Sequence, residues 1–163
     1  MTIDINYVME LVVQLLQIES PTGYTYHAID FLEQEAEKLG YQTVQDEKGN
    51  LILAIKGKDK KRVLGFSAHM DTLGLMVRSI KENGTLAFTW LGAPILNTLD
   101  GEYCTVITQD HRCYSGTILS ISSASHVFRD ASTAKRDEET MEIRLDEIIK
   151  SRQDVIYLQY DQN

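Results

Sequence analysis

The sequence predicts an α/β fold in two parts, an incomplete α/β domain over residues 1–71 followed by a small β-barrel domain over residues 72–163. Apolar residues recur at helical spacing in the first 40 residues. An apolar run then leads into a polar cluster that ends at Asp71, as expected where a buried strand reaches the edge of a sheet. After Asp71, short β-prone segments alternate with turn residues, a spacing typical of small barrels or sandwiches.

Two helices are expected at the N-terminal end. The first should end before Ser20-Pro21-Thr22-Gly23, because proline disfavours helical backbone in the residue that precedes it. The second is expected from about Thr25 to Leu39, with Gly40 as its stop. The apolar face of the first helix comprises Ile5, Val8, Leu11, Val12, Leu15 and Leu16.

Strands are expected next. Residues 41–45 and 51–55 flank a turn with Gly49 at the position that favours positive φ, which predicts a hairpin. Residues 63–68 predict a buried central strand. A first part of about 70 residues is thin for an α/β domain, because its sheet needs cover on both faces; we therefore interpret it as part of something larger.

The second part predicts short strands separated by turns and one long surface excursion. The excursion covers residues 122–140, which are polar and charged. A last helix is expected from Ser151 to Tyr160, with Ser151 and Asp154 at the spacing of a helix cap. The strand candidates are residues 73–80, 85–90, 102–109, 114–121 and 141–145, the last alternating strictly between apolar and charged residues.

Composition limits the function. The 163-residue chain carries a formal net charge of −8, which argues against nucleic acid or an anionic membrane as main partner. Its two cysteines, Cys104 and Cys113, are interpreted as free thiols of a reducing compartment. We find no signal-peptide pattern and no apolar stretch of membrane-spanning length, so a cytoplasmic location is expected.

The chemical site predicted from the residues is Ser67-Ala68-His69-Met70-Asp71. His69 and Asp71 are two positions apart, so in extended backbone their side chains point to the same side. The imidazole of His69 can then bind a metal while the carboxylate of Asp71 orients the ring. The alternative is a histidine at a strand end beside a turn-forming aspartate.

The other candidate groups favour structural roles. His27 and His111 are expected to be solvated. His126 lies in the long polar excursion, and loops often carry function, but metal ligation there is disfavoured. The acidic clusters at residues 33–37 and 137–139 are interpreted as solvated faces and not as paired catalytic carboxylates.

Read together, several motifs resemble one family. Residues 20–23, 46–50, 67–71 and 73–77 look like the N-terminal half of the glutamyl aminopeptidase or deblocking (tetrahedral) aminopeptidase family, some of whose members are labelled endoglucanase. Residues 116–118, 126–127 and 141–147 extend this resemblance to about Leu158.

The resemblance implies a two-metal exopeptidase that acts on peptides. The family's α/β catalytic domain holds two zinc or cobalt ions, and a β-barrel domain used for assembly is inserted after the His-x-Asp strand. Dimers of such chains build a hollow dodecamer, so a homo-oligomer is expected. Carried over, His69 would bind one metal and Asp71 would be the catalytic-site carboxylate that orients it.

Departures from the family define the expected function. Thr72 stands where the family commonly has glutamate, and the tail after Leu158 leaves the family's pattern. The bridging aspartate, the glutamate pair and the later ligands of the family all come downstream of the barrel, and none is found in this chain. We therefore interpret the chain as an N-terminal fragment of a metal-dependent aminopeptidase that is inactive or nearly so by itself, because one imidazole cannot hold a metal pair.

The sequence leaves two alternative functions. The first is a non-catalytic assembly module whose β domain binds itself or a full-length homologue through its edge strands. The second is a carbohydrate hydrolase, which rests only on the family's endoglucanase label. That activity requires paired carboxylates across a sugar cleft, and the sequence offers no such pair.

Overall fold

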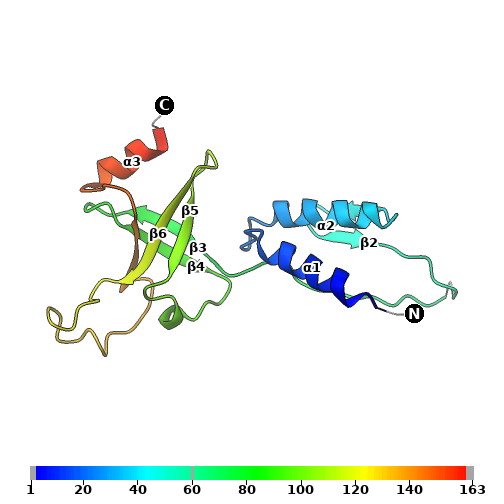
Figure 1. Ribbon diagram of the computed structural model, residues 1–163, viewed down its shortest axis with the longest axis horizontal. Helices are drawn as coiled ribbons and strands as arrows, with labels where there is room; N and C mark the ends of the chain where they lie inside the picture. Colours follow the sequence, from blue (N-terminus) through cyan, green and yellow to red (C-terminus); the bar gives the residue numbers. More distant parts are fainter. Residues whose placement is uncertain (1–2, 60, 161–163) are drawn as a thin grey trace. The chain divides into compact units, whose positions relative to one another are not determined.

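We analysed a computed structural model that describes residues 3–59 and 61–160 (Figure 1). The chain divides into two compact units, Met1–Leu73 and Gly74–Asn163, and each is described by itself. The first unit contains two helices and a hairpin, and the second contains a five-stranded antiparallel sheet, a 3₁₀ turn and a helix.

The first unit begins with helix α1 (Ile5–Leu16) and helix α2 (Tyr26–Lys38), followed by strands β1 (Thr43–Gln45) and β2 (Leu51–Leu53). The two strands pair antiparallel, with Val44 opposite Ile52. The predicted pair of helices and the predicted hairpin are therefore confirmed.

Local side-chain and backbone signals set the ends of these elements. The carboxylate of Asp4 accepts a hydrogen bond from the backbone N–H of Tyr7 at 3.1 Å and caps α1. Gly40, at φ +80°, ends α2 in the left-handed conformation that glycine adopts without steric cost. The carboxylate of Asp46 accepts hydrogen bonds from the backbone N–H groups of Lys48 and Asn50 and closes the hairpin turn.

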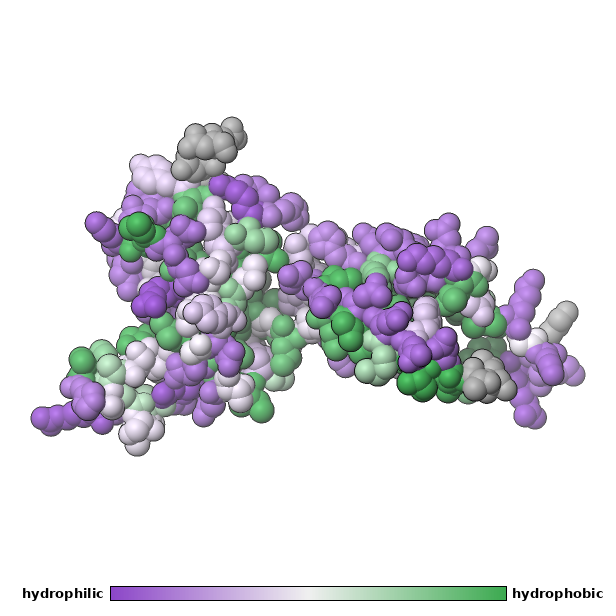
Figure 2. Space-filling model, in the orientation of Figure 1, coloured by the Kyte–Doolittle hydropathy of each residue, from purple (hydrophilic) through white to green (hydrophobic). Residues whose placement is uncertain are grey.

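Helix α1 has an apolar stripe but no buried residue. Its side chains Ile5, Met9 and Leu16 are 63%, 56% and 70% exposed. Figure 2 shows hydrophobic residues along this helix at the surface of the first unit. A large uncovered apolar surface of this kind is characteristic of a contact with another polypeptide segment.

The predicted buried strand at residues 63–68 is wrong. Residues 62–71 have no regular secondary structure, and Val63, Leu64 and Phe66 are 96%, 81% and 91% exposed. The apolar pattern predicts burial only where other strands and helices cover it. No strand among the described residues pairs with this segment, because the hairpin sheet ends with β1 and β2.

The second unit is a curled antiparallel half-barrel. Its strand order is β3 (Gly74–Ile80), β4 (Leu86–Leu91), β7 (Met141–Leu145), β6 (Cys113–Ser120) and β5 (Tyr103–Ile107). The last strand in sequence thus lies at the centre, with β3 and β5 at the edges. The predicted module of short antiparallel strands is confirmed.

The core of the second unit lies on one face of this sheet. Phe88 of β4 and Met141 of β7 are fully buried, and Ile143 and Leu145 alternate with the outward-facing Arg144. This alternation confirms the pattern predicted for residues 141–145. The remaining fully packed members are Leu86, Leu96, Ile118 and Val155.

The segment between β6 and β7 has no helix or strand, as predicted, but an ion pair anchors it. Arg136 donates from Nε to the carboxylate of Asp100 at 2.8 Å and from Nη1 to the carbonyl of Ala134 at 2.7 Å. Asp100 also accepts a hydrogen bond from the backbone N–H of Ser120 at 2.9 Å. Both side chains are about four-fifths buried, so this pair ties the long segment to the turn that precedes β5.

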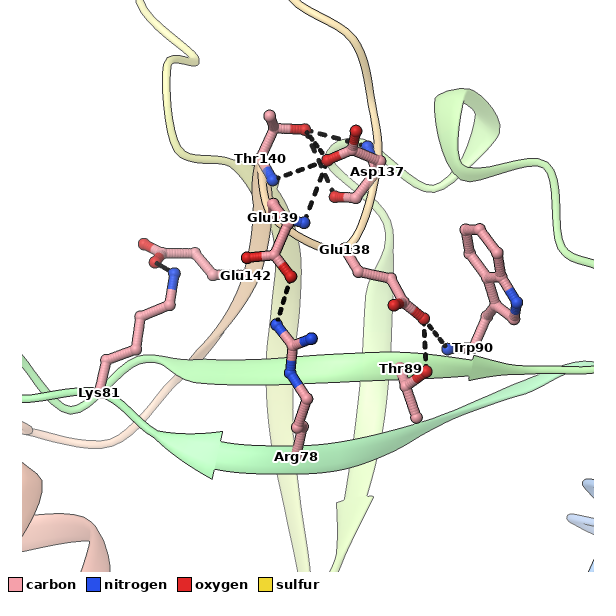
Figure 3. A network of polar contacts seen from close by, with 9 residues as sticks. All are labelled: Arg78, Lys81, Thr89, Trp90, Asp137, Glu138, Glu139, Thr140 and Glu142. Atoms are coloured by element: carbon pink, nitrogen blue, oxygen red, sulfur yellow. Dashed lines mark hydrogen bonds and ion pairs between the residues drawn. The ribbon is translucent and has the colours of Figure 1, made fainter.

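The acidic residues 137–139 are not a solvated face throughout, which corrects that prediction (Figure 3). Glu138 is half-buried and accepts hydrogen bonds from the hydroxyl of Thr89 at 2.5 Å and the backbone N–H of Trp90 at 2.9 Å. Glu139, which is exposed, pairs with Arg78 of β3 at 2.9 Å. These carboxylates attach the end of the long segment to β3 and β4.

The chain's last described element is helix α3 (Arg152–Tyr160). The carboxylate of Asp154 accepts hydrogen bonds from the backbone N–H and the hydroxyl of Ser151, at 2.9 and 3.0 Å, which confirms the predicted cap. None of the described helices is long and apolar enough to cross a membrane.

Candidate metal-binding site

The predicted pair, His69 and Asp71, lies at the end of the extended segment of the first unit. The Nδ1 atom of His69 is 3.1 Å from Oδ1 of Asp71 and 3.2 Å from its backbone carbonyl oxygen. The imidazole side chain is 85% exposed and the carboxylate 38%. Both contacts involve Nδ1, so the Nε2 atom of the ring is the one that faces solvent and is available to a ligand.

A turn from the first half of the unit holds Asp71 in place. The hydroxyl of Thr22 donates a hydrogen bond to Oδ2 of Asp71 at 2.7 Å, across 49 residues of sequence. The backbone N–H of Thr72 donates to the carbonyl of Ser20 at 2.7 Å, and Pro21 forms an isolated parallel bridge with Thr72. The Ser20–Gly23 turn is thereby fixed against the His69–Asp71 segment.

The electrostatics favour an ionised carboxylate. The hydrogen bond from the Thr22 hydroxyl, aided by the nearby imidazole of His69, lowers the pKa of Asp71 below its usual value. Asp71 is therefore an anion at neutral pH and acts only as a hydrogen-bond acceptor.

Next to this pair lies a buried serine. Ser20 is 1% exposed, and its Oγ has no hydrogen-bond partner among the described residues. A buried hydroxyl without a hydrogen-bond partner destabilises the fold.

The residues present fit one metal ligand but not a complete two-metal site. An exposed imidazole nitrogen with its other nitrogen held by a carboxylate is the usual arrangement of a histidine ligand. Within residues 3–59 and 61–160, however, no group of three or more His, Cys, Asp and Glu side chains is placed to hold a metal ion.

The other histidines lie on other elements of the chain. His27 lies on α2, with its ring 4.2 Å from that of Tyr26 between centroids. His111 occupies the β5–β6 turn at φ +62°, and His126 lies in the long segment between β6 and β7. His27 and His111 are exposed, as the sequence predicted, and His126 is exposed as well.

Sequence reasoning missed Thr22 as a partner of Asp71. The motif Ser20-Pro21-Thr22-Gly23 was interpreted only as a helix stop and turn, because no local pattern links it to a segment 49 residues away. The available signal for such a partner was the hydroxyl of Thr22 between Pro21 and Gly23, two residues that restrict a turn.

The chain is similar in fold to two solved TET peptidases. The TET aminopeptidase of a marine-sediment Thaumarchaeota archaeon superposes with a TM-score of 0.80 at 25% identity, over 93% of this chain and 41% of that one. The TET1 peptidase of Pyrococcus horikoshii superposes with a TM-score of 0.75 at 25% identity, over 92% of this chain and 43% of that one.

Sequence comparison gives the family. The description M42 glutamyl aminopeptidase applies to the family model that matches residues 49–161. This chain belongs to the M42 glutamyl aminopeptidase family, whose members are metal-dependent. It is 42% identical over 146 residues to YhfE, a candidate aminopeptidase of Bacillus subtilis (strain 168).

The resemblance stated from the motifs is thus confirmed, with a difference in length. The aligned part covers 90% of this chain but only 42% of YhfE. The chain therefore spans less than half the length of the curated relative, and the fold that it shares with TET aminopeptidases is likewise part of theirs.

Proposed function

We propose that this chain supplies the first part of the catalytic domain and the β assembly domain of a metal-dependent aminopeptidase that removes N-terminal residues from peptides. In this proposal His69 binds one divalent ion, zinc or cobalt, through Nε2, and Asp71 holds the ring. The observation that carries it is the 3.1 Å contact between His69 Nδ1 and Asp71 Oδ1, which leaves Nε2 exposed.

Each residue's role follows from its contacts. The Asp71 carboxylate fixes the ring plane of His69 and favours a proton on Nδ1, which raises the basicity of Nε2. A bound divalent ion supplies Lewis-acid activation of a carbonyl or of water. The described residues offer no second and third ligand near His69, so we propose that the chain alone releases no N-terminal residues.

The test uses the purified chain and Co²⁺, whose paramagnetism shifts and broadens nearby NMR signals. We expect Co²⁺ to perturb the imidazole signals of His69 at lower concentration than those of His126, which contacts no carboxylate among the residues that the structure describes. His69→Gln should abolish the strongest response, whereas His126→Gln should leave it unchanged.

Aminopeptidase assays complete the test. Short peptides are incubated with the chain, with zinc or cobalt added and then chelated, and released amino acids are measured. We expect no release above background. Metal-dependent release that disappears in His69→Ala would show that the chain is an enzyme by itself. It would overturn the proposal that the chain alone is inactive.

A second candidate function is a non-catalytic assembly module that binds a second copy of this chain. The edge strands β3 and β5 favour it, because Met76 and Tyr103 on these strands are 54% and 79% exposed. The related TET1 peptidase of Pyrococcus horikoshii assembles into a tetrahedron or an octahedral shell.

Light scattering coupled to size-exclusion chromatography tests the assembly module. A stable homo-oligomer that Met76→Lys or Tyr103→Lys dissociates would support it, because a charge on an edge strand opposes pairing. A monomer, or heterogeneous aggregation in all three proteins, would count against it.

A further inference from the structure

The geometry points to Thr22 as the positioning residue of the His69–Asp71 pair: its hydroxyl fixes the carboxylate so that Nδ1 of His69 keeps its proton and Nε2 is presented to the metal. This inference rests on the proposed function for its purpose. The contact that carries it is the 2.7 Å hydrogen bond from Thr22 Oγ1 to Asp71 Oδ2.

The two oxygens of Asp71 have different partners. Oδ2 accepts from Thr22 at 2.7 Å, and Oδ1 lies 3.1 Å from His69 Nδ1. A carboxylate anion accepts hydrogen bonds and cannot donate them, so a hydrogen bond at Oδ1 requires a proton on Nδ1. In a neutral imidazole with a proton on Nδ1, the lone pair is on Nε2, the nitrogen that remains exposed.

Without the Thr22 hydroxyl, Oδ2 of Asp71 has no side-chain hydrogen-bond donor among the described residues. Asp71 is 38% exposed, so water can take the free place and the carboxylate can rotate about its χ angles. The geometry at Oδ1 is then no longer fixed, and the proton on the neutral ring redistributes between the two nitrogens.

Backbone contacts and restricted backbone angles around Thr22 hold its hydroxyl beside Asp71. Two backbone contacts lie next to the Thr22–Asp71 hydrogen bond. The N–H of Thr72 donates to the carbonyl of Ser20 at 2.7 Å, and Pro21 forms a bridge with Thr72. The ring of Pro21, directly before Thr22, fixes the φ angle of that proline, and Gly23, directly after it, adopts φ +89°. The turn therefore has little conformational freedom.

The experiment measures the tautomer of His69 in the metal-free chain. Two-bond ¹H–¹⁵N correlation spectra of ¹⁵N-histidine-labelled protein, recorded near pH 8, well above the ordinary imidazole pKa of about 6.5, distinguish a proton on Nδ1 from one on Nε2. His69→Gln identifies the signals of His69 among those of the four histidines.

We expect the Nδ1–H form to predominate in the parent chain and in Thr22→Ser, which keeps the hydroxyl. In Thr22→Val, of nearly equal shape, the ratio of Nδ1–H to Nε2–H should fall about fivefold, the factor that corresponds to one ordinary hydrogen bond. The matched control is Thr43→Val, which removes a similar 2.9 Å hydrogen bond from a threonine hydroxyl to Glu33 elsewhere in the same unit and should leave the ratio unchanged.

Three results would overturn the inference: a parent chain with the proton mainly on Nε2, an unchanged ratio in Thr22→Val, or an equal shift in Thr43→Val. None of these depends on metal. The proposed function instead fails if Co²⁺ does not perturb His69 selectively, so the two failures are distinguishable.

Discussion

At the residue scale, aspartate and glutamate carboxylates organise the turns and loops of both units. Asp46 closes the hairpin turn, Asp71 connects the Ser20–Gly23 turn to His69, and Glu138 attaches the long segment to β4. In each case hydrogen bonds to the ionised form lower the pKa below its usual value. Folding and ionisation of these groups are therefore coupled.

The sign of that coupling is the same for all three groups. A carboxyl whose pKa is lower in the folded than in the unfolded state stabilises the fold above its unfolded value. This stabilisation is lost as the pH falls through the lower, folded value. Acid should therefore release these contacts, and neutral or alkaline conditions should keep them.

Glu138 provides a test of this coupling. The Thr89 hydroxyl and the Trp90 N–H lower its pKa from the ordinary value of 4.5, so its contribution is complete above that pH and declines below it. We expect Glu138→Gln to have a lower melting temperature than the parent chain at pH 7. The difference between the two melting temperatures should become smaller as the pH falls below 4.5. Thermal denaturation over a series of pH values measures it.

The exposed Glu139 is the matched control. Its pair with Arg78 is on the surface, with 77% of the glutamate side chain exposed, and such pairs contribute little. Glu139→Gln should therefore change the melting temperature less at pH 7 than Glu138→Gln does. Equal effects would contradict a specific role for Glu138.

At the element scale, the turn between β3 and β4 depends on a glycine for two reasons. Gly84 has φ +85°, and a Cβ atom there would collide with Cγ2 of Ile149 and lie 2.9 Å from the carbonyl oxygen of Ser151. The turn thus packs directly against the segment that leads into α3. Any side chain at this position forces these elements apart.

We expect Gly84→Ala to destabilise the second unit more than Gly101→Ala. Gly101 has φ +96° but no atom within 4 Å of the added Cβ, so its substitution reports backbone strain alone, roughly 1–3 kcal/mol. Gly84→Ala should cost about 1–3 kcal/mol more, because the core must also accommodate an overlap. Urea denaturation of both variants measures the difference, and equal costs would show that the loop relaxes.

The elements that could be predicted from sequence are those set by local chemistry. The ends of α1 and α2, the β1–β2 turn and the Ser151–Asp154 cap each depend on residues within a few positions of one another. The prediction of a buried strand at residues 63–68 was wrong, because an apolar pattern indicates burial only where another part of the protein covers the segment. Nothing in the described residues covers them.

Long-range pairings could not be predicted for a related reason. The position of β7 between β4 and β6, and the contact of Thr22 with Asp71, join residues far apart in sequence. No pattern within one segment specifies its distant neighbour. At the candidate site the sequence therefore predicted His69 and Asp71, which are two positions apart, and not Thr22, which holds Asp71 from 49 residues away.

At the scale of the whole molecule, the two units have different cores. The hydrophobic cluster that contains Phe88, Met141 and Ile143 consists only of residues of the second unit. In the first unit the buried apolar side chains are Ala28, Ile29 and Ala36, all on α2. The first unit thus buries much less apolar surface, and hydrophobic stabilisation scales with the area removed from water.

We expect this difference to make the two units unfold separately. Phe88 is fully buried, and Phe88→Ala should lower the free energy of unfolding of the second unit by about 3–5 kcal/mol. Ile29 is 4% exposed, and Ile29→Ala should reduce the stability of the first unit by about 2–5 kcal/mol. Because neither core contains residues of the other unit, each substitution should act only on its own unit.

Native-state hydrogen exchange, read by mass spectrometry on peptides from α2 and from β6 and β7, separates the two responses. Phe88→Ala should speed exchange in β6 and β7 and leave α2 unchanged, and Ile29→Ala should do the reverse. The parent chain should already exchange faster in α2, because the smaller core opens at a lower free energy. Faster exchange in α2 on Phe88→Ala would mean instead that both units unfold as one cooperative body. The uncovered apolar surface of the first unit would then lower the free energy of unfolding of the whole chain.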